Sequence, residues 1–589
     1  MISAPQSTRL TPFAAAALLG VMAAVMALSA WDDTATTDDV VSIGAGYSYL
    51  RKQEYRFEPQ NPPLIKDLAA LPLIFMQLHE PWNHQSWSGT VEVQDPDLFG
   101  RALLYHSGND ADAITRAARV PMILFTLAFG AVFFWWTRNK FGDSAALLAL
   151  FLYCLSPTFL THGRMMATDL GATAAFFIGI TAFLRFLKDP STVNVLLAGC
   201  AMGFAFLTKF STIALVPIAL ILAGVWALVS SHEKGWVRSL VACLARTVCV
   251  IALGYLVVYP VYLFHIWNFK PADQVASAIF HRDLYGMGGT AKDLVIWASD
   301  KTLLRPWAEY FLGLLVALKA SWWGQPVFLL GKVYPAGQRI YFPLVYLIKE
   351  PLALHLLTLI ALLMAMARIR LSVFQPARLR QLLSEHFTQF AFLLVLAIYW
   401  AALIRSNMNI GVRHLLPAFP FTFILVSEQI VKVIQKFGQK FRQPAAIGIL
   451  RMGLAALLAW QAYSVLRIHP SYLAYFNEAA GGPDGGWRYV NDSNLDWGQD
   501  VKRLAQFVEE HKITGIHADY FGPADAGYYL KEKYLGPVGC SDLPKGWIAV
   551  SAMIYPGAPW NPSCDYRQRL PLEKMVAKIG YSIFVFHLD

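Results

Sequence analysis

The stretch of sequence that decides the fold is WDDTATTDDVVSIGAGYSYL, from Trp31 to Leu50. It follows directly on a hydrophobic segment, and it holds four aspartates within eight positions. Carboxylates so close together repel one another, so they need solvent, hydrogen bonds or cations around them. Such a cluster at the end of an apolar segment indicates a membrane-surface loop with a purpose beyond connecting two helices.

The composition is that of a membrane protein. Of the 589 residues, 56% are hydrophobic and 15% are charged, whereas soluble domains carry roughly 25% charged residues. Because a helix that crosses a bilayer needs about 20 apolar residues, we expect about 11 such helices in this chain. The sequence therefore predicts a polytopic α-helical membrane protein. The expected spans are residues 12–30, 119–137, 144–161, 169–187, 193–209, 212–230, 239–263, 341–367, 388–404, 413–431 and 445–465.

The first apolar segment has two interpretations. Its weakly basic start and its Ala-Leu-Ser-Ala ending at residues 27–30 are also typical of a cleaved signal peptide. Many apolar spans follow it, however, and a retained first helix gives a consistent topology. Basic residues in alternate connections then assign those connections to the cytoplasm. These residues are Arg9, Arg138, Lys140, Arg185, Lys188, Lys234, Arg238, Arg368, Arg370, Arg378, Arg380, Lys432, Lys436, Lys440 and Arg442.

An odd number of spans with a cytoplasmic N-terminus places residues 31–118, 264–340 and everything after 466 on the outside. Both outer loops are too long to be simple connectors. In the second, FLGLLVALKASWW (Phe311–Trp323) is typical of a helix lying in the membrane interface, with a short re-entrant piece as the alternative. The net charge of +10 belongs mostly to the cytoplasmic bias, so we expect membrane lipids as partners and no nucleic acid.

The composition changes near residue 470. The stretches GIHADYF, GWIAVSAMIY and YSIFVFHL are typical of strands, and VKRLAQFVEEHK is typical of an amphipathic helix. We therefore expect a membrane-embedded domain over residues 1–469 and a small extracytoplasmic α/β domain over residues 470–589. Cys540 and Cys564 are the two cysteines of that tail. An oxidising exterior lets them form a disulfide, and two free thiols are the alternative.

The aspartates of the first outer loop have different interpretations. Asp32 and Asp33 directly follow the first span, and a solvated loop that caps the helix accounts for them. Asp38 and Asp39 instead open a helical apolar pattern, VVSIGAGYSYL, where the helix dipole and the free N–H groups stabilise carboxylates. A carboxylate held in that position stays ionised and can accept a proton.

After this helix come a short polar link and NPPLIKDLAALPL (Asn61–Leu73), in which two prolines and Lys66 open a second amphipathic helix. This order resembles the first outer loop of the lipid-carrier-dependent membrane glycosyltransferases of the C-type fold. That group contains the protein O-mannosyltransferases and the bacterial aminoarabinose transferase. Its loop reads Asp-Glu, two residues, His-Ile, Ala-Gly-Tyr and then Pro-Pro-Leu-x-Lys. The resemblance places Asp38 at the catalytic aspartate and Asp39 at the glutamate, and Ser42 replaces the histidine.

Further stretches resemble the same family pattern, in order along the chain. SPTFLTHGRMMATDLGAT (Ser156–Thr173) resembles the second outer loop, with Arg164 and Asp169 as its arginine and second acid. The closing stretch HPSYLAYFNEAAGGPDGGWRYVNDSNLDWGQDVKRL resembles the signature of a bacterial branch with an extra C-terminal soluble domain. The others are LTKFS with Lys209, YLIKEPLAL with Lys349 and Glu350, and NMNIGVRHLLPAFPF with Arg413 and His414.

These residues form the candidate site. Several lie at the outer ends of the predicted spans, so one cavity that opens outward could gather them. Ionisable side chains at such depth are functional candidates, and the cations suit a phosphate or pyrophosphate. The alternative for each Lys or Arg alone is a side chain that extends to the lipid headgroups. We predict Asp38, Asp39 and Asp169 as catalytic residues, and Lys66, Arg164, Lys209, Lys349, Arg413 and His414 as ligands of the donor phosphate.

Histidines offer a less specific signal. For His162, His414 and His469, a hydrogen-bonded residue at the membrane interface explains the sequence better than a metal ligand does. The His and Cys spacings that characterise metal sites do not accompany them. The resemblance requires no cofactor, because Lys and Arg supply the positive charge. A divalent metal held by the paired acids is possible but is not indicated.

The resemblance implies transfer of a sugar from a polyprenyl-phosphate donor to an acceptor hydroxyl at the outer face of a bacterial inner (plasma) membrane. Asp38 would act as general base, and one displacement would invert the anomeric configuration. The acceptor is a protein, a lipid or a glycan. A transporter or flippase of polar lipids is the alternative, although such folds usually show internal repeats, and this sequence shows none. A non-catalytic assembly factor would instead use DSNLDWGQD as a binding surface.

Overall fold

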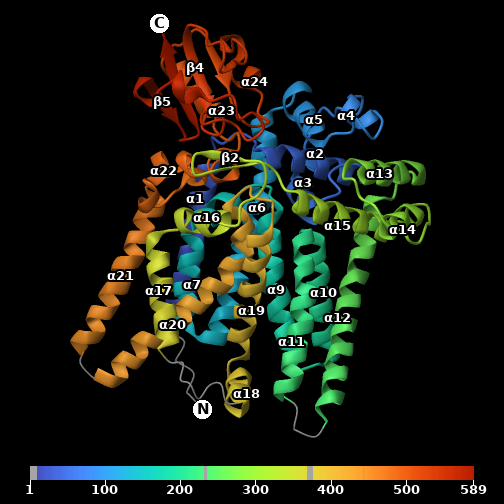
Figure 1. Cartoon of the computed structure of the whole chain (residues 1–589), viewed down its shortest axis with the longest axis vertical. Coiled ribbons are helices and arrows are strands. Elements are labelled where there is room, and N and C mark those ends of the chain that lie inside the picture. Colours follow the sequence, from blue (N-terminus) through green and yellow to red (C-terminus); the bar gives the residue numbers. More distant parts are fainter. Residues whose placement is uncertain (1–9, 231–234, 368–375, 442–443) are drawn as a thin grey trace.

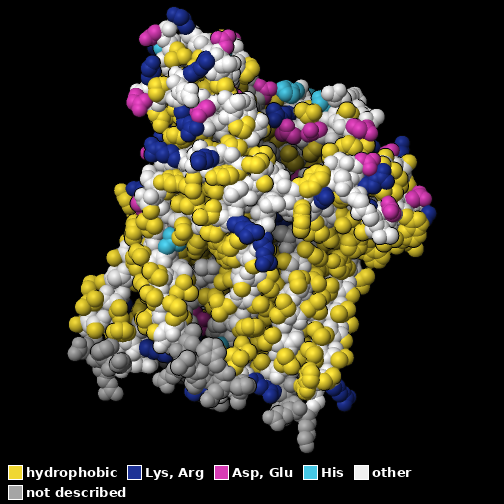
Figure 2. Space-filling model, viewed as in Figure 1, with side chains coloured by type: hydrophobic (Ala, Val, Ile, Leu, Met, Phe, Trp, Pro, Cys, Tyr) yellow, Lys and Arg dark blue, Asp and Glu magenta, His cyan; other side chains and the backbone are white. Residues whose placement is uncertain are grey.

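The computed structural model describes residues 10–230, 235–367, 376–441 and 444–589. Long helices form a layer, and the C-terminal domain and the two long loops gather at one end of it (Figure 1). On the face that Figure 2 shows, hydrophobic side chains cover most of the surface of the helices, and most of the charged side chains lie above and below this area. This distribution is expected where helices face lipid. Of the basic residues that predict the orientation, those outside the described residues are Arg9, Lys234, Arg368, Arg370 and Arg442.

Among the described residues, eight helices are long and apolar enough to cross a membrane. A ninth span results if α16 (Tyr341–Lys349) and α17 (Leu352–Met366), which meet at 112°, are counted as one. The polytopic fold is confirmed, but the expected count of about 11 full-length spans is not. The spans are formed by α1 (Leu10–Ala30), α6 (Ala111–Phe141), α9 (Thr168–Lys188), α11 (Leu215–Ser230) with the preceding turn, α12 (Trp236–His265), α19 (Phe387–Arg405), α20 (Phe419–Phe441) with the preceding turn, and α21 (Pro444–Leu466).

The remaining predicted spans are shorter or broken helices. Two of them break just before a proline, at Pro157 and at Pro351. A residue that precedes proline is disfavoured in the helical conformation, and Glu350 is accordingly extended, with φ −105° and ψ 151°. Such breaks leave polar backbone and side chains at the outer ends of the helices. The short helices are α7 (Asp143–Cys154), α8 (Pro157–His162) and α10 (Thr192–Thr208).

The first outer loop folds into short helices that pack on one another, as predicted. α2 (Thr37–Lys52) begins with a capping box, in which Thr36 Oγ1 accepts from the Asp39 N–H and Asp39 Oδ2 accepts from the Thr36 N–H. Gly46 lets α2 lie directly on α3 (Leu64–Ala70), because a Cβ there would stand 2.4 Å from the backbone oxygen of Lys66. The other elements are η1 (Leu71–Phe75), α4 (Gln85–Ser88), α5 (Pro96–Arg101) and the π-helical η2 (Ala102–His106).

The second outer loop lies across the upper ends of the helices (Figure 1). Its longest helix, α15 (Arg305–Trp323), is not among the candidate spans and crosses the ends of α10–α12. This placement agrees with the expected interfacial helix. The other elements are α13 (Pro271–Leu284), α14 (Thr290–Ser299) and an antiparallel pair of strands, β1 (Val327–Leu329) and β2 (Lys332–Tyr334). Shorter segments elsewhere are η3 (Phe210–Ala214), α18 (Pro376–Glu385) and η5 (Val412–Ala418).

The C-terminal domain is built on a four-stranded sheet with the order β3-β4-β6-β5, so the small α/β domain is confirmed. β3 runs parallel to β4, and β6 runs antiparallel to both β4 and β5. Both faces of the central strands are buried, since Ile548 and Phe584 belong to one core and Ala549 and Val585 to another. The strands are β3 (Ile516–Asp519), β4 (Gly546–Ser551), β5 (Met575–Ile579) and β6 (Ile583–Leu588), and the helices are α22 (Gly482–Gly485), α23 (Val501–Glu510) and α24 (Ala526–Leu530). Single 3₁₀ turns lie between them: η6 (Tyr472–Ala474), η7 (Glu478–Ala480), η8 (Gly486–Arg488), η9 (Asp492–Asn494), η10 (Lys531–Lys533), η11 (Tyr566–Gln568) and η12 (Leu572–Lys574).

The segment that enters this domain pairs with the start of the first outer loop. Thr34 donates its backbone N–H to the Gln499 oxygen at 2.9 Å and its hydroxyl to the Gly498 oxygen at 2.6 Å. The N–H of Thr37 bonds to the Trp497 oxygen at 3.3 Å. We refer to residues 471–500, which lead into the C-terminal domain, as the C-terminal segment. This segment therefore holds the N-terminus of α2, where Asp38 and Asp39 lie.

Candidate active site

Four of the predicted site residues meet in one cluster at the outer ends of the helices. Arg413 Nη1 donates a hydrogen bond to Asp38 Oδ2 and lies 3.4 Å from Asp169 Oδ2. Lys209 Nζ lies 2.5 Å from the other carboxylate oxygen of Asp169. Each acid thus has a cation beside it, and each cation has an acid. The structure brings together residues that are far apart in the sequence.

Each side chain of this cluster comes from the end of a helix. Asp38 and Asp169 lie in the first turns of α2 and α9. Lys209 is an extended residue between α10 and η3, with φ −160°, and Arg413 lies at the start of η5. Gly411, which precedes η5, lies so close to the C-terminal segment that a Cβ would stand 2.2 Å from a serine hydroxyl. Because these helix ends lie close together at the same side of the helical layer, the four side chains meet.

Asp38 is the most accessible member of the cluster. Its side chain is 34% exposed, compared with 2% for Asp169, 7% for Arg413 and 18% for Lys209. Desolvation raises the pKa of Asp38 above its usual value, and the Arg413 guanidinium opposes this rise. A carboxylate with a raised pKa is a stronger base once it is ionised. Asp38 therefore combines access with base strength.

Asp39 makes structural contacts instead. It is fully buried, with one oxygen 2.8 Å from the Met166 N–H and the other 2.6 Å from Arg119 Nη2. Arg119, which is 1% exposed, also donates to three backbone carbonyls between residues 30 and 34. Asp39 thus ties the start of α2 to α6. The catalytic role expected for it stays a prediction, and these contacts favour a role in positioning α2.

Asp33 is buried and ion-paired, so the expectation of a solvated cap is wrong for this residue. Arg164 Nη1 donates to its Oδ2, and Arg503 Nη2 lies 2.7 Å from its Oδ1. Desolvation alone raises the pKa of Asp33, but the attraction of Arg164, Arg503 and Arg119 lowers it below its usual value. Arg164 and Arg503 come from distant parts of the chain, and the sequence alone does not show that they pair with Asp33. Asp32 does face solvent, with 44% of its side chain exposed.

Lys66 is engaged within the first outer loop. Its Nζ lies 2.9 Å from Glu58 Oε2 and donates to the backbone oxygen of Asn61 at 3.0 Å. Only 1% of the Lys66 side chain is exposed. Glu58 is one of the charges that contribute to the raised pKa of Asp38. Lys66 therefore shapes the loop beside the cluster.

Lys349 lies beneath the C-terminal segment, where its Nζ donates to the backbone oxygens of Leu473 at 2.8 Å and Asn494 at 2.6 Å. These bonds attach the segment to the end of α16. His414 follows Arg413 in the chain, and its backbone oxygen accepts a hydrogen bond from the Tyr399 hydroxyl at 2.8 Å. Lys349, like Lys66 and Arg164, thus has protein partners where the sequence predicts a phosphate.

The C-terminal segment adds neighbours of the cluster that the sequence did not identify. The ring of Trp497 lies 4.2 Å from the Arg413 guanidinium. Burial raises the pKa of Asp492 to about 6, an effect that Arg413 opposes and Asp38 strengthens. Asn494 Oδ1 accepts a backbone hydrogen bond at the start of η5 at 2.9 Å. These residues belong to the stretch NDSNLDWGQD, which stood out in the sequence, but only its folding back onto the helices reveals the contacts.

His162 differs from its expected role as a hydrogen-bonded interface residue. Its ring lies edge-on to Trp497, with centroids 5.9 Å apart, and 1% of the residue is exposed. Within the described part of the chain, neither ring nitrogen has a hydrogen-bond partner. Buried polar groups without a protein partner usually bind water or a ligand.

Over residues 10–230, 235–367, 376–441 and 444–589, no group of three or more His, Cys, Asp or Glu side chains is placed to hold a metal ion. The positive charge of the cluster comes from Arg413 and Lys209. Cations held by neighbouring acids can respond to charge that develops on a substrate.

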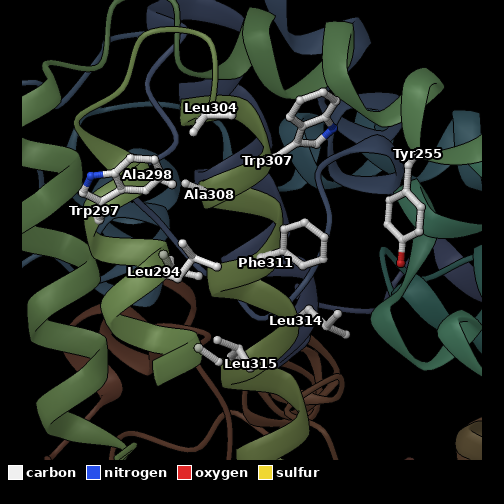
Figure 3. A pocket seen from close by; sticks show the side chains of 12 residues that line it. Tyr255, Leu294, Trp297, Ala298, Leu304, Trp307, Ala308, Phe311, Leu314 and Leu315 are labelled. Carbon is white, nitrogen blue, oxygen red and sulfur yellow. The ribbon is translucent and has the colours of Figure 1, made fainter. Parts of the chain in front are cut away.

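An apolar groove of about 560 Å³ lies between α12, α14 and α15 (Figure 3). Leu294, Trp307 and Phe311 line it, together with nine further residues. On the opposite side of α15, the ring of Tyr310 lies 5.2 Å from that of Phe210, which follows Lys209 in the chain. α15 thus contacts both the groove and the residue that follows Lys209.

Known proteins resemble this chain in sequence and in fold. Residues 112–260, from α6 to α12, match the family described as dolichyl-phosphate-mannose-protein mannosyltransferase. No curated protein matches the chain. The resemblance to lipid-carrier-dependent glycosyltransferases is thereby confirmed over these helices, whereas the bacterial branch stays a prediction.

Three solved structures are similar to the chain. The S. cerevisiae protein O-mannosyltransferase Pmt1-Pmt2 complex, bound to the sugar donor, is 11% identical, with a TM-score of 0.50 over 86% of this chain and 92% of that one. At this identity the similarity concerns the fold alone. The oligosaccharyltransferase AglB from Archaeoglobus fulgidus, with an inhibitory peptide and a dolichol-phosphate, is 13% identical, with a TM-score of 0.47 over 94% of this chain and 72% of that one. ArnT from Cupriavidus metallidurans, bound to undecaprenyl phosphate, is 13% identical, with a TM-score of 0.29 over 97% of each chain.

Proposed function

We propose that this protein is an inverting glycosyltransferase that moves a hexosyl or pentosyl group from a polyprenyl-phosphate-linked donor to an acceptor hydroxyl. The observation that supports this function most directly is the cluster of Asp38, Arg413, Asp169 and Lys209, which joins an accessible carboxylate to two cations. The fold is similar to that of a mannosyltransferase complex solved with its sugar donor.

In the proposed reaction, the acceptor oxygen attacks the anomeric carbon of the donor sugar. A new carbon–oxygen bond forms while the bond from that carbon to the phosphate oxygen breaks, and polyprenyl phosphate leaves with the bonding electrons. Asp38 takes the proton of the acceptor hydroxyl. Because the acceptor attacks opposite the leaving phosphate, one displacement inverts the anomeric configuration.

Arg413 and Lys209 stabilise the charge that develops on the leaving phosphate. Arg413 keeps N–H donors that these contacts do not use, since its hydrogen bonds to Asp38 and Asp169 both come from Nη1. Its Nε has no hydrogen-bond partner in the described part of the chain. A guanidinium offers two parallel donors, which suits a phosphate. The cations make a metal unnecessary, so a chelator such as EDTA should leave transfer unchanged.

The donor's lipid chain has a suitable place in the groove beside α15. Trp307 and Phe311 of α15 line this groove, and Tyr310 of the same helix contacts Phe210, which follows Lys209 in the chain. A prenyl chain lying there would direct its phosphate around α15 to Lys209. Apolar burial of this kind gives affinity, while the cations fix the position of the headgroup.

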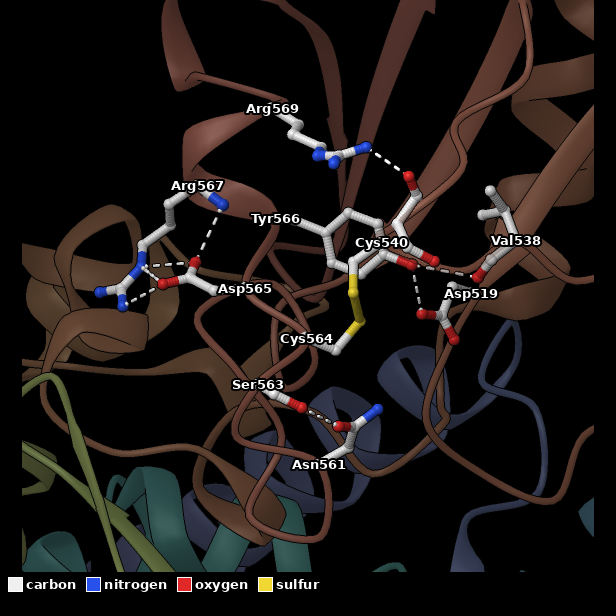
Figure 4. The surroundings of a disulfide bond; sticks show 11 residues. Asp519, Val538, Cys540, Asn561, Ser563, Cys564, Asp565, Tyr566, Arg567 and Arg569 are labelled. Carbon is white, nitrogen blue, oxygen red and sulfur yellow. Dashed lines mark hydrogen bonds and ion pairs between the residues drawn. A yellow bond between two sulfur atoms is a disulfide. The ribbon is translucent and has the colours of Figure 1, made fainter.

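We place the cluster on the outer side of a bacterial inner membrane, with the N-terminus in the cytoplasm. The two long loops and the C-terminal domain all lie at one end of the helical layer (Figure 1). A disulfide joins Cys540 and Cys564 in that domain (Figure 4), which supports an oxidising compartment.

Mass analysis of envelope glycans tests this proposal in cells that lack the protein. Cells that regain the wild-type protein should add a sugar to one class of glycan, and cells that receive Asp38→Asn should not. Asp32→Asn is the matched control, because this acid is 44% exposed and lies outside the cluster. Glycans that are identical with and without the protein would refute the proposed function.

A further inference from the structure

An exposed aromatic ring lies on a rigid turn of the C-terminal domain. Trp560 is 56% exposed and sits in a tight turn between Ala558 and Asn561, which form an isolated β-bridge. The disulfide of Cys564 with Cys540 anchors the base of this turn (Figure 4). A single exposed apolar side chain is common on protein surfaces; here the turn that carries the ring is also covalently anchored, and the ring stacks on a second aromatic residue.

This ring connects to the candidate active site through other aromatic residues. Trp560 stacks on Phe521, with centroids 5.4 Å apart and planes inclined by 30°. Phe521 packs on the small hydrophobic cluster that contains Trp497. Trp497 in turn lies 4.2 Å from the Arg413 guanidinium, which holds Asp38. The exposed ring is thus the outer end of an aromatic column that reaches the cation cluster.

Two glycines allow this column to form. Gly498 follows Trp497 with φ +84°, and Gly522 follows Phe521 with φ +125°, conformations that glycine adopts without strain. A Cβ on Gly522 would stand 2.5 Å from the Gly498 Cα, so the two loops touch only because neither residue has a side chain. The backbone is therefore shaped to bring the aromatic residues of the two loops together.

The charged side chains around the disulfide already have protein partners (Figure 4). Arg567 pairs with Asp565 at 2.7 Å, and the Tyr566 hydroxyl donates to Asp519 at 2.6 Å. A surface with paired charges does not select a strongly charged partner. This argues against an anionic lipid headgroup or a basic peptide as the occupant.

Neutral hydrogen-bonding groups accompany the ring. Ser563 donates to Asn561 Oδ1 at 2.9 Å, and the amide nitrogen of Asn561 points away from this bond (Figure 4). A sugar ring presents a face of C–H groups and a rim of hydroxyls, which match an aromatic face and an amide donor. A lipid chain would instead need a wider apolar surface.

We propose that Trp560 and Phe521 form the acceptor-binding surface and that the acceptor is a glycan. The inference rests on the proposed function, because the acceptor sugar would stack on Trp560 while a hydroxyl of the same glycan reaches Asp38. It also gives the C-terminal domain a role, since this domain carries both aromatic residues.

The test is binding of the full-length protein, held in nanodiscs, to an array of mannose, glucose, galactose and N-acetylglucosamine oligosaccharides. The wild-type protein should bind at least one class of oligosaccharide, and Trp560→Ala should weaken this binding by about tenfold. Trp560→Phe, which keeps a ring, should lose less. Val576→Ala is the matched control, because Val576 lies on β5 of the same domain and is 53% exposed; it should bind as the wild type does.

Several results would overturn this inference. They are a wild-type protein that binds no oligosaccharide, equal binding by Trp560→Ala, and Trp560-dependent binding of a peptide array alone, which would identify a protein acceptor. The Asp38→Asn variant separates the two proposals, because it should bind glycans normally. If glycan binding depends on Trp560 but the wild-type protein transfers no sugar, the glycan-binding surface stands, and the proposed function and the acceptor role of this surface fail.

Discussion

The Asp39→Asn substitution should destabilise the protein, in contrast to the same change at its neighbour Asp38. Asp39 is fully buried, and its carboxylate lies 2.6 Å from Arg119 Nη2, inside the protein. Asparagine keeps the size of the side chain but carries no charge. Arg119 would then be a buried cation without its carboxylate.

The expected magnitude follows from these contacts. Removing one partner of a buried ion pair typically costs about 3–5 kcal/mol, because the other charge stays desolvated. The amide oxygen of asparagine can still accept one of the two backbone hydrogen bonds, from Thr36 at 3.1 Å or Met166 at 2.8 Å. Folded domains are stable by only about 5–15 kcal/mol, so the loss is a large fraction of the total.

Thermal unfolding of the purified protein in detergent measures this effect. Asp38→Asn is the matched control, since Arg413 keeps its contact with Asp169 and the Asp38 side chain is 34% exposed. We expect Asp39→Asn to lower the midpoint markedly and Asp38→Asn to lower it little. Combining Asp39→Asn with Arg119→Met should not recover the stability, because the methionine would leave the backbone oxygens of Ala30, Asp33 and Thr34 without their donor.

The opposite pattern would refute this reasoning. If Asp39→Asn unfolds at the wild-type temperature but has lost sugar transfer, Asp39 acts in the chemistry, as the family resemblance implies. The ion pair with Arg119 would then not explain why an aspartate occupies position 39.

Three further predictions concern pH, the C-terminal segment and the topology. Transfer should be lost as pH falls through the pKa of Asp38, because the base must be ionised, and the midpoint should lie above the usual 3.8, since desolvation raises this pKa; a pH profile that is flat down to 3.8 contradicts this. Lys349→Ala should lower the thermal midpoint, because it leaves two buried carbonyls unpaired at about 1–3 kcal/mol each, whereas weaker donor binding at unchanged stability would indicate a phosphate contact. A reporter enzyme fused after Asp589 should be active only outside the cytoplasm, and cytoplasmic activity would overturn the orientation.

The sequence predicts the helices well, because long apolar segments have few alternatives. It could not predict their breaks in full. Pro157 and Pro351 were visible, but hydropathy continues across both positions, so two broken helices looked like single spans. The breaks matter, since polar residues at helix ends form the site.

The cluster of Asp38, Asp169, Lys209 and Arg413 was predictable as a group, because the topology places all four at the same membrane surface. That Lys66, Arg164 and Lys349 lie apart from this cluster could not be predicted. A lone lysine or arginine in a sequence gives no sign of which carboxylate or carbonyl it will meet. The partners of Arg164 and Lys349 come from distant segments, as Asp33 does for Arg164, whereas those of Lys66 lie within its own loop.

The contribution of the C-terminal segment was the least predictable part. Trp497 and Asp492 lie in a conspicuous stretch, but nothing local indicates that this stretch folds back onto Arg413. Trp497 and Asp492 lie 84 and 79 positions after Arg413 in the chain. Only the folded arrangement of the chain reveals them.

The measurement that tests the central claim most directly is transfer from a labelled polyprenyl-phosphate sugar by the purified protein in liposomes, with Asp38→Asn compared with Asp32→Asn. Asp38→Asn should bind the donor normally but transfer sugar about 100 to 10,000 times more slowly, because the amide cannot take the acceptor proton. Asp32→Asn should transfer at the wild-type rate, because its side chain is 44% exposed and lies outside the cluster. Near-wild-type turnover by Asp38→Asn would contradict the assignment of Asp38 as the general base.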